Sequence, residues 1–303
     1  MLAVSPITDT LTRRWETFRV QDTEPTLESP VSQLVTRSQC DSPIYREWCN
    51  IMKIDPEGQY LRYDRKLWEW VYILQALRLK GMFSEGKRGL GFGVGNEPLT
   101  AVMAKYGSEI VATDMPHEAA LEEGWAAWEQ HAKELADLNS ARICDADQFK
   151  RLVEYRVLDM RRIDQELTGF DFVWSSCSLE HLGSLEAGAA FVLESLRCLK
   201  PGGVAVHTTE FNLSSDLITL TEGGVSLYRR RDILALAEQI EKKGYRITLN
   251  LHAGTHEMDK HYDLPPFRQA DHHLKLLFEM FITTSIGLII EAPQLADGAS
   301  EQP

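Results

Sequence analysis

The stretch that decides the fold is rich in glycine and reads Gly89-Leu90-Gly91-Phe92-Gly93-Val94-Gly95-Asn96-Glu97-Pro98. It lies where a first short apolar strand passes into a helical pattern. Glycines let the backbone turn tightly and approach a bound molecule, and Asn96 and Pro98 are typical of a helix start whose N–H groups face the same molecule. The spacing is neither the dinucleotide motif G-x-G-x-x-G nor a P-loop, so a pyrophosphate is not the expected ligand.

Short apolar strands alternate with helical patterns from residue 87 onward. We expect strands over residues 88–91, 109–114, 155–159, 170–176, 204–210, 245–251 and, with an interruption, 275–291. We expect the main helices over residues 98–106, 118–138, 185–199 and 231–243. Such alternation predicts an α/β fold in which a mostly parallel sheet carries helices on both faces.

Carboxylates close two of the strands that follow the glycine loop. Asp114 ends the second strand, where a carboxylate can accept hydrogen bonds from both hydroxyls of a ribose. Asp159 ends the third strand and is followed by Met160, which adds an apolar side chain where an adenine ring could lie. The ends of three consecutive strands are therefore expected to point into one crevice.

Five motifs, in this order, resemble those of the class I S-adenosylmethionine-dependent methyltransferases over about residues 86–291. They are Gly91-x-Gly93-x-Gly95, Ala112-Thr113-Asp114, Leu158-Asp159-Met160, Phe170-Asp171-Phe172-Val173-Trp174-Ser175-Ser176 with Glu180-His181, and Leu199-Lys200-Pro201-Gly202-Gly203. The resemblance implies a Rossmann-like, seven-stranded sheet whose last strand is antiparallel, with S-adenosylmethionine as cofactor over the ends of the first four strands. The cofactor-binding residues that it implies are Gly91, Gly93, Gly95, Asp114, Met115, Asp159, Met160 and Ser175.

One position departs from the family pattern. The family usually has an acidic residue two positions before the first glycine of the motif, and this chain has Gly89 there. An anchor for the methionine end of the cofactor is therefore missing. Glu97 and Asp171 are both candidates to replace it.

The chain is expected to divide into four parts. Residues 1–40 are rich in Thr, Ser, Pro and charge and are predicted to be a mobile N-terminal arm. Residues 41–84 have helical periodicity and are predicted to be a helical cap, whose many aromatic side chains are expected mainly in the core. Residues 85–292 are predicted to be the S-adenosylmethionine-binding domain, and residues 293–303 a flexible tail.

Two side chains are candidates to receive a proton from the acceptor. A sulfonium methyl group is already activated, so the enzyme must mainly align the acceptor, but an acceptor hydroxyl also has to lose its proton. His181 follows the fourth strand and Glu210 ends the fifth, so both are predicted catalytic residues. His207, three residues before Glu210, is expected to be a buried histidine with hydrogen-bond partners.

No metal is expected. Glu180-His181 is similar to part of the Glu-x-x-Glu-His metal motif of small-RNA 2′-O-methyltransferases, but Cys177 stands where the first glutamate would be. The later metal histidine would fall near Val225 or Ser226. The polar run from His252 to Asp263 matches no standard metal signature.

The charge of the chain limits its partners. Its 303 residues include 45 acidic and 32 basic side chains, a net charge of −13, which makes nucleic acid an improbable partner because phosphate binding requires an excess of Lys and Arg. No apolar run reaches the roughly 20 residues that a membrane span requires. The N-terminus lacks the pattern of a signal peptide and the five cysteines are not spaced as C-x-x-C, so we expect a cytoplasmic protein without disulfides.

The sequence thus predicts an S-adenosylmethionine-dependent methyltransferase that modifies a hydroxyl of a sugar, glycan or other small molecule. The amino-acid sequences of the glycine loop and of residues 207–215 are similar to those of bacterial methyltransferases of polysaccharide and glycoconjugate biosynthesis. Two alternatives stay open: an RNA 2′-O-methyltransferase, and a non-catalytic cofactor-binding scaffold of a methyltransferase complex. The sequence does not predict an oligomeric state.

Overall fold

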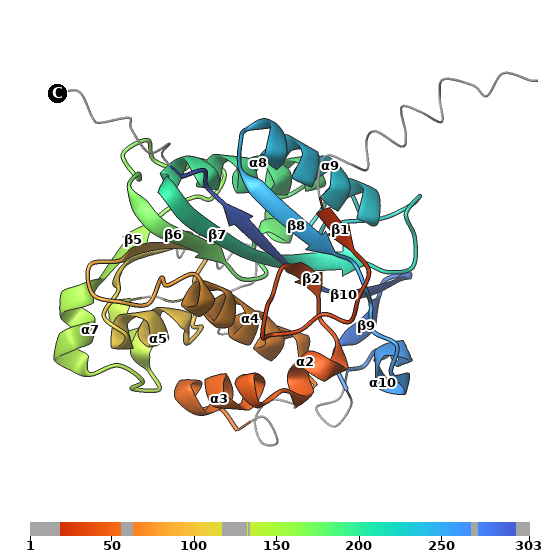
Figure 1. Cartoon of the computed structure of the whole chain (residues 1–303), viewed down its shortest axis with the longest axis horizontal. Coiled ribbons are helices and arrows are strands. Elements are labelled where there is room, and N and C mark those ends of the chain that lie inside the picture. Colours follow the sequence, from red (N-terminus) through yellow and green to blue (C-terminus); the bar gives the residue numbers. More distant parts are fainter. Residues whose placement is uncertain (1–18, 56–62, 117–131, 133, 268–271, 295–303) are drawn as a thin grey trace, which may run out of the picture.

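A computed structural model describes residues 19–55, 63–116, 132, 134–267 and 272–294. Within this part of the chain, ten strands form one sheet that lies between two layers of helices (Figure 1). The strands are β1 (Arg19–Gln21), β2 (Ser32–Leu34), β3 (Arg88–Phe92), β4 (Glu109–Asp114), β5 (Val153–Val157), β6 (Phe170–Ser175), β7 (Leu199–Asn212), β8 (Arg246–Asn250), β9 (Lys275–Phe278) and β10 (Phe281–Glu291). The α-helices are α2 (Arg37–Asp41), α3 (Pro43–Met52), α4 (Arg65–Leu79), α5 (Leu99–Lys105), α7 (Ala146–Leu152), α8 (Leu185–Ser195), α9 (Arg230–Lys242) and α10 (Glu257–Lys260), and the short 3-10 helices are η1 (Leu135–Asn139), η2 (Leu179–His181) and η3 (Leu196–Cys198).

The strands lie in the order β1-β8-β2-β10-β7-β6-β3-β4-β5, and β9 pairs with β10. The five strands from β7 to β5 are parallel to one another, and β10 is antiparallel to β2, β7, β8 and β9. The predicted α/β fold and the antiparallel last strand are therefore confirmed. The carboxyl ends of β3, β4, β5 and β6 meet at one edge of the sheet, and the crevice is expected there.

The predicted number of seven strands is wrong. Two of the additional strands, β1 and β2, come from the segment expected to be a mobile arm, and both pair in parallel with β8. Each has only three residues, too few for an alternating pattern to be visible in the sequence. The third arises because the interruption expected within 275–291 is a turn between two separate strands, β9 and β10.

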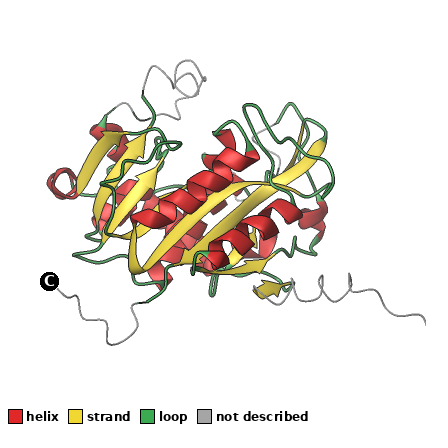
Figure 2. Cartoon of the chain, turned by 90° about the horizontal axis from the view of Figure 1, so that it is seen from above, coloured by secondary structure: helices red, strands yellow, loops and turns green. Residues whose placement is uncertain are grey.

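The alternating side chains of the strands pack into two cores. Phe172 and Trp174 face the core beneath α3, α4 and α5, whereas Val173 faces the core beneath α8 and α9. Figure 2, turned by 90°, shows the strands running between helices on both sides. This arrangement buries nearly continuous apolar strands, as a parallel sheet requires.

Helix α4 lies directly on the sheet. It begins at the N-cap Asp64, whose carboxylate accepts hydrogen bonds from the backbone of Lys66 and Leu67. A Cβ atom added at Gly287 of β10 would lie only 2.0 Å from Cε1 of Tyr72, so this glycine is what allows α4 to approach the strand. The segment that the sequence predicts as a helical cap thus includes a helix with eleven buried residues that forms part of the core.

The aromatic side chains of this segment lie in the core, as expected. Trp48, Trp68 and Tyr72 are fully buried, and Trp70 and Tyr63 are nearly so. The division of the chain at residues 40, 84 and 292 remains a prediction. Most of the expected helix 118–138 and most of the expected tail lie outside the described residues.

Candidate functional site

The glycine loop joins β3 to α5 and is held against the end of β4. The backbone N–H of Val94 donates to the carbonyl of Thr113 at 3.1 Å. Gly93 and Gly95 have φ angles of 57° and 49°, in the left-handed region that favours glycine. At Gly91 a Cβ atom would lie 2.4 Å from Cζ2 of Trp174, so no other residue fits without moving the ring.

Asp114 lies beside this loop, where the sequence predicts a ribose-binding carboxylate. Its Oδ2 accepts a hydrogen bond from the backbone of Gly95 at 3.0 Å, and its Oδ1 accepts one from the backbone of Met115 at 2.8 Å. The side chain is buried, and the neighbouring Thr113 hydroxyl donates to the carbonyl of Gly91 at 2.7 Å. Glycine loop, Asp114 and Met115 therefore form one connected unit.

Asp159 and Met160 lie two and three residues beyond the end of β5. The sequence predicts that the strand ends at Asp159. In the structure β5 begins two residues earlier than predicted, directly after α7, and ends at Val157. The Asp159 carboxylate binds the backbone and guanidinium of Arg161, whose hydrogen bonds are the largest cause that lowers the pKa of Asp159. Met160 is buried, and its sulfur would lie 3.2 Å from a Cβ added at Gly93, so it contacts the loop.

Ser175 is the last residue of β6, one residue before the predicted end of this strand, and its hydroxyl forms hydrogen bonds within the core. It lies 2.8 Å from Nδ1 of His207, and Ser195 Oγ lies 3.1 Å from Nε2 of the same ring. Burial lowers the pKa of His207 to about 3, so the ring is neutral. His207 is thus the buried, hydrogen-bonded histidine that the sequence predicts.

Gly89, where the family has an acid, cannot accommodate a side chain. An added Cβ would lie 2.4 Å from two ring atoms of Phe172. Of the two proposed replacements, Asp171 lies at the other end of β6, where its carboxylate binds Lys87 at 3.1 Å and Lys200 at 2.9 Å. Glu97, in contrast, directly follows the glycine loop.

His181 lies in the short helix η2, which follows β6. Its Nδ1 is 2.7 Å from the carbonyl oxygen of Gly224, and because a carbonyl can only accept, Nδ1 carries the hydrogen. In the neutral ring, Nε2 is then the atom that can take up a proton. Nε2 lies 3.9 Å from Oε1 of Glu180, a fully buried carboxylate whose other oxygen accepts from the Thr209 hydroxyl at 3.0 Å.

Glu210 lies near the end of β7 and is paired with Arg65 at the start of α4. The guanidinium Nη1 is 2.5 Å from Oε1 of Glu210, 3.2 Å from the Ser285 hydroxyl and 3.6 Å from Oε1 of Glu69. Burial raises the pKa of Glu210 to about 7, although Arg65 opposes the rise. At neutral pH this carboxyl group can therefore both accept and release a proton.

Glu69, in the middle of α4, connects this pair to the sheet. It is completely buried, and its two oxygens accept hydrogen bonds from Ser285 of β10 at 2.5 Å and Thr208 of β7 at 2.7 Å. We call Arg65, Glu69, Cys177, Glu180, His181, Glu210 and Ser285 the acceptor cluster. The sequence analysis missed Arg65 and Glu69, although a charged residue between two tryptophans, in Trp68-Glu69-Trp70, is a signal of a buried partner.

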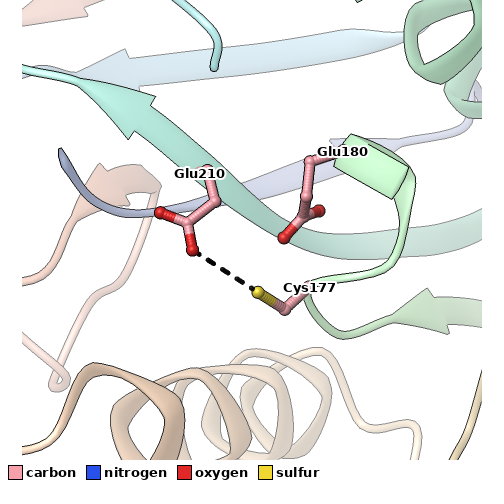
Figure 3. Close-up of side chains that lie close together, drawn as sticks. All are labelled: Cys177, Glu180 and Glu210. Carbon is pink, nitrogen blue, oxygen red and sulfur yellow. Dashed lines mark hydrogen bonds between the residues drawn. The ribbon is translucent and has the colours of Figure 1, made fainter. Parts of the chain in front are cut away.

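Figure 3 shows the group of side chains within this cluster that could hold a metal ion. One ligand atom from each of Cys177, Glu180 and Glu210 lies within 4.8 Å of the others. Burial raises the pKa of the Cys177 thiol well above its usual range. The Arg65 guanidinium already supplies a positive charge to Glu210, and the arrangement is better explained by this internal cation than by a divalent ion.

The polar run after β8 does not join the cluster. His252 lies 3.0 Å from Asp22 and 3.3 Å from Glu24, both in the N-terminal part of the chain. His256 caps α10, with its Nδ1 accepting from the backbone of Met258 at 3.1 Å. In the described ranges, Cys177, Glu180 and Glu210 are the only set of three or more metal-capable side chains.

Residues 90–207, from β3 to the middle of β7, match a protein-family model described as a methyltransferase domain. This part of the chain is therefore a methyltransferase domain of class I, and S-adenosylmethionine is its cofactor. The site fits that molecule, because the glycine loop has no side chains at Gly91, Gly93 and Gly95 and Asp114 lies beside it. No curated protein matches the sequence.

Several solved structures are similar to the chain. Magnesium protoporphyrin IX methyltransferase from Synechocystis PCC 6803, with bound S-adenosylmethionine, is 12% identical with a TM-score of 0.46, over 84% of this chain and 94% of that one. Phosphoethanolamine N-methyltransferase 2 from Haemonchus contortus is 20% identical with a TM-score of 0.40, over 66% and 44%. A candidate sarcosine dimethylglycine methyltransferase from Galdieria sulphuraria is 19% identical with a TM-score of 0.35, and the chain spans about half of it, 51%. At these identities and TM-scores, the similarity does not identify the acceptor.

In the described part of the chain, the helices are too short or too polar to cross a bilayer.

Proposed function

We propose that the chain methylates a hydroxyl group of a sugar, glycan or other small molecule, with S-adenosylmethionine as methyl donor. The observation that carries the proposal is the path of residues 177–181. Ser178 contacts the glycine loop, with its hydroxyl 3.4 Å from the carbonyl of Gly93, and His181 follows three residues later. A single short segment thus joins the cofactor loop to a group that can accept a proton.

The proposed reaction needs little from the protein beyond alignment and one proton acceptor. S-Adenosylmethionine, held by the glycine loop and Asp114, would supply an activated methyl group to the acceptor oxygen and would leave as S-adenosylhomocysteine. The hydroxyl proton of the acceptor passes to a protein side chain.

His181 is the group that we assign to this proton. Its Nδ1–H is fixed by the carbonyl of Gly224, which leaves Nε2 as the basic atom, and the nearby Glu180 carboxylate stabilises the imidazolium that forms. Glu210 is the second predicted catalytic residue. Its pairing with Arg65 favours a role in binding the acceptor hydroxyl, while its pKa of about 7 also allows it to take the proton.

The proposal that the acceptor is a sugar or glycan rests on the similarity of the glycine loop and of residues 207–215 to methyltransferases of polysaccharide and glycoconjugate biosynthesis. The buried aromatic side chains of α3 and α4 lend no support to stacking on a sugar ring, since they lie in the core. Hydrogen-bonding groups of the acceptor cluster would then recognise the hydroxyls. Incubation with labelled S-adenosylmethionine and host extract, followed by mass identification of the product, tests the acceptor class directly.

The proton acceptor is tested with His181→Ala and Glu210→Gln at saturating cofactor and acceptor. General-base assistance is typically worth about a hundredfold or more in rate, so at least one variant should lose that much turnover and still bind the cofactor. His252→Ala, a histidine paired with Asp22 outside the acceptor cluster, is the matched control and should retain full turnover. If both site variants stay within about threefold of the parent, the proposed proton transfer is wrong. Labelled RNA as the product, or cofactor binding with no product from any extract, would instead favour one of the alternative functions.

A further inference from the structure

Two charged side chains, one beside the glycine loop and one at the start of α4, have no role in the mechanism above. Glu97 follows the glycine loop, and its Oε2 is buried without a hydrogen-bond partner. Lys66 is on the first turn of α4 and has one third of its side chain, 34%, exposed. Within the described residues, its nearest carboxylate oxygen is Oε2 of Glu69, at 4.0 Å, which is the limit for an ion pair.

The charges of these two side chains influence each other although 31 positions separate them in the sequence. Burial raises the pKa of Glu97 to about 7, and the Lys66 ammonium is the strongest influence that opposes this rise. Trp70, one turn further along α4, and Ser176, at the end of β6, also face Glu97. The pair therefore lies where α4, the glycine loop and the end of β6 meet.

The amino-acid end of S-adenosylmethionine carries one ammonium and one carboxylate. A site for it needs a negative and a positive group close together, in a crevice that excludes enough water for the charges to matter. The acid that the family usually provides is absent, because the Phe172 ring fills the space at Gly89. Asp171 is occupied by Lys87 and Lys200 at the far end of β6.

We propose that Glu97 and Lys66 bind the amino-acid end of the cofactor, Glu97 its ammonium and Lys66 its carboxylate. Helix α4, which precedes the matched methyltransferase domain in the chain, thereby supplies part of the cofactor site. The inference rests on the proposed function, since it requires this chain to bind S-adenosylmethionine. It adds a residue outside the family motif to the cofactor site.

The test compares two ligands by calorimetry. S-Adenosylhomocysteine carries the amino and carboxyl groups, whereas 5′-methylthioadenosine has the same nucleoside and sulfur without them. Charge-assisted hydrogen bonds of this kind support an expected loss of about tenfold or more in S-adenosylhomocysteine affinity for Lys66→Met and for Glu97→Gln. Affinity for 5′-methylthioadenosine should stay within about twofold of the parent in both variants.

A third ligand assigns each residue to its group. Decarboxylated S-adenosylmethionine keeps the ammonium and lacks the carboxylate, so Lys66→Met should not weaken it, whereas Glu97→Gln should. Glu97→Asp and Lys66→Arg, which keep the charges, should recover part of the affinity for S-adenosylhomocysteine. Lys80→Met, at the other end of α4 and paired with Glu291 at 3.0 Å, is the matched control and should leave all affinities unchanged.

Two results would overturn the inference. Unchanged S-adenosylhomocysteine affinity in both variants would mean that neither side chain contacts the cofactor. An equal loss for S-adenosylhomocysteine and 5′-methylthioadenosine would mean that they only support the shape of the crevice. If the parent protein binds neither ligand, the proposed function itself fails, which is a different outcome from failure of the roles proposed for Glu97 and Lys66.

Discussion

The glycine loop with Asp114 and the acceptor cluster are connected through residues 177–181 but are assembled differently. The loop reaches Asp114 through a contact between residues only 19 positions apart, and glycine backbone conformation defines its shape. The acceptor cluster joins side chains as distant as Arg65 and Ser285, 220 positions apart, and consists of charges and hydroxyls. A local motif fixes the first, whereas the packing of α4 on β7 and β10 fixes the second. Substitutions in the glycine loop with Asp114 should therefore have effects that differ from those of substitutions in the acceptor cluster.

The largest effect is expected from Glu69→Gln. This change leaves the Arg65 guanidinium with one carboxylate fewer in a buried site, where breaking such a pair typically costs about 3 to 5 kcal/mol. Urea unfolding should show this loss in the free energy of unfolding, and turnover should fall with it. Glu47→Gln, which removes an exposed partner of Arg78, should cost at most about 1 kcal/mol. Equal effects of the two changes would contradict a buried network that holds α4 on the sheet.

Asp114→Ala should act on the cofactor and leave the acceptor cluster intact. Loss of one charged hydrogen-bonding group to the ribose is expected to cost about 1.5 to 3 kcal/mol, or roughly ten- to a hundredfold in affinity for S-adenosylhomocysteine. Calorimetry measures the affinity, and unchanged binding would exclude Asp114 from the cofactor site. Because Asp114 also holds the glycine loop through Gly95, circular dichroism must show the variant to be folded.

The difference between the local glycine loop and the long-range acceptor cluster also explains which parts of the fold and of the site could be predicted from the sequence. The α/β fold and the positions of Gly91, Gly93 and Asp114 follow from strand periodicity and from one loop, because each depends on residues near it in the chain. From the sequence alone, Asp171 could have been excluded, because it stands at the start of the predicted strand 170–176 and therefore at the edge of a parallel sheet opposite the glycine loop. Arg65 and Glu69 were missed because their partners Glu210, Ser285 and Thr208 are on strands more than 100 positions away.

Gly89→Ala tests whether Phe172 is the reason that the family acid is missing. The new Cβ would lie 2.4 Å from a ring that packs against Trp174, and overpacking of this kind typically costs about 1 to 3 kcal/mol. Gly89→Asp should be destabilised at least as much and should not bind S-adenosylhomocysteine more tightly. Gly224→Ala, whose Cβ would meet no atom within 4 Å, is the control for stability. Tighter binding by a stable Gly89→Asp protein would contradict the assignment of this role to Glu97.

The smallest effect is a difference in pH dependence between two side chains of β7. His207, between Ser175 and Ser195, has a pKa of about 3, below the usual 6.5 of histidine, because it is buried. Below pH 6.5 this histidine is protonated in the unfolded chain and stays neutral in the folded chain. Its contribution to the free energy of unfolding is therefore complete above pH 6.5 and is lost as the pH falls toward 3. Glu210 has the opposite sign, because burial raises its pKa from 4.5 to about 7 while Arg65 and Lys66 oppose the rise and Glu180 and Glu69 add to it. Its contribution is complete below pH 4.5 and is lost as the pH rises toward 7.

Urea unfolding at pH 4.5, 5.5 and 6.5 separates the two groups. The stability of the parent minus that of His207→Gln should decrease as the pH falls, by roughly 1 kcal/mol per pH unit, since one proton bound differently corresponds to about 1.4. The same difference for Glu210→Gln should increase as the pH falls, by a similar amount. Differences that run in the same direction would mean that one of the two groups is not in the protonation state described here. The two strand positions are only three residues apart and both side chains are buried, so opposite slopes would show that the sign is set by the charge of the ionised group: burial disfavours the imidazolium of His207 and the carboxylate of Glu210.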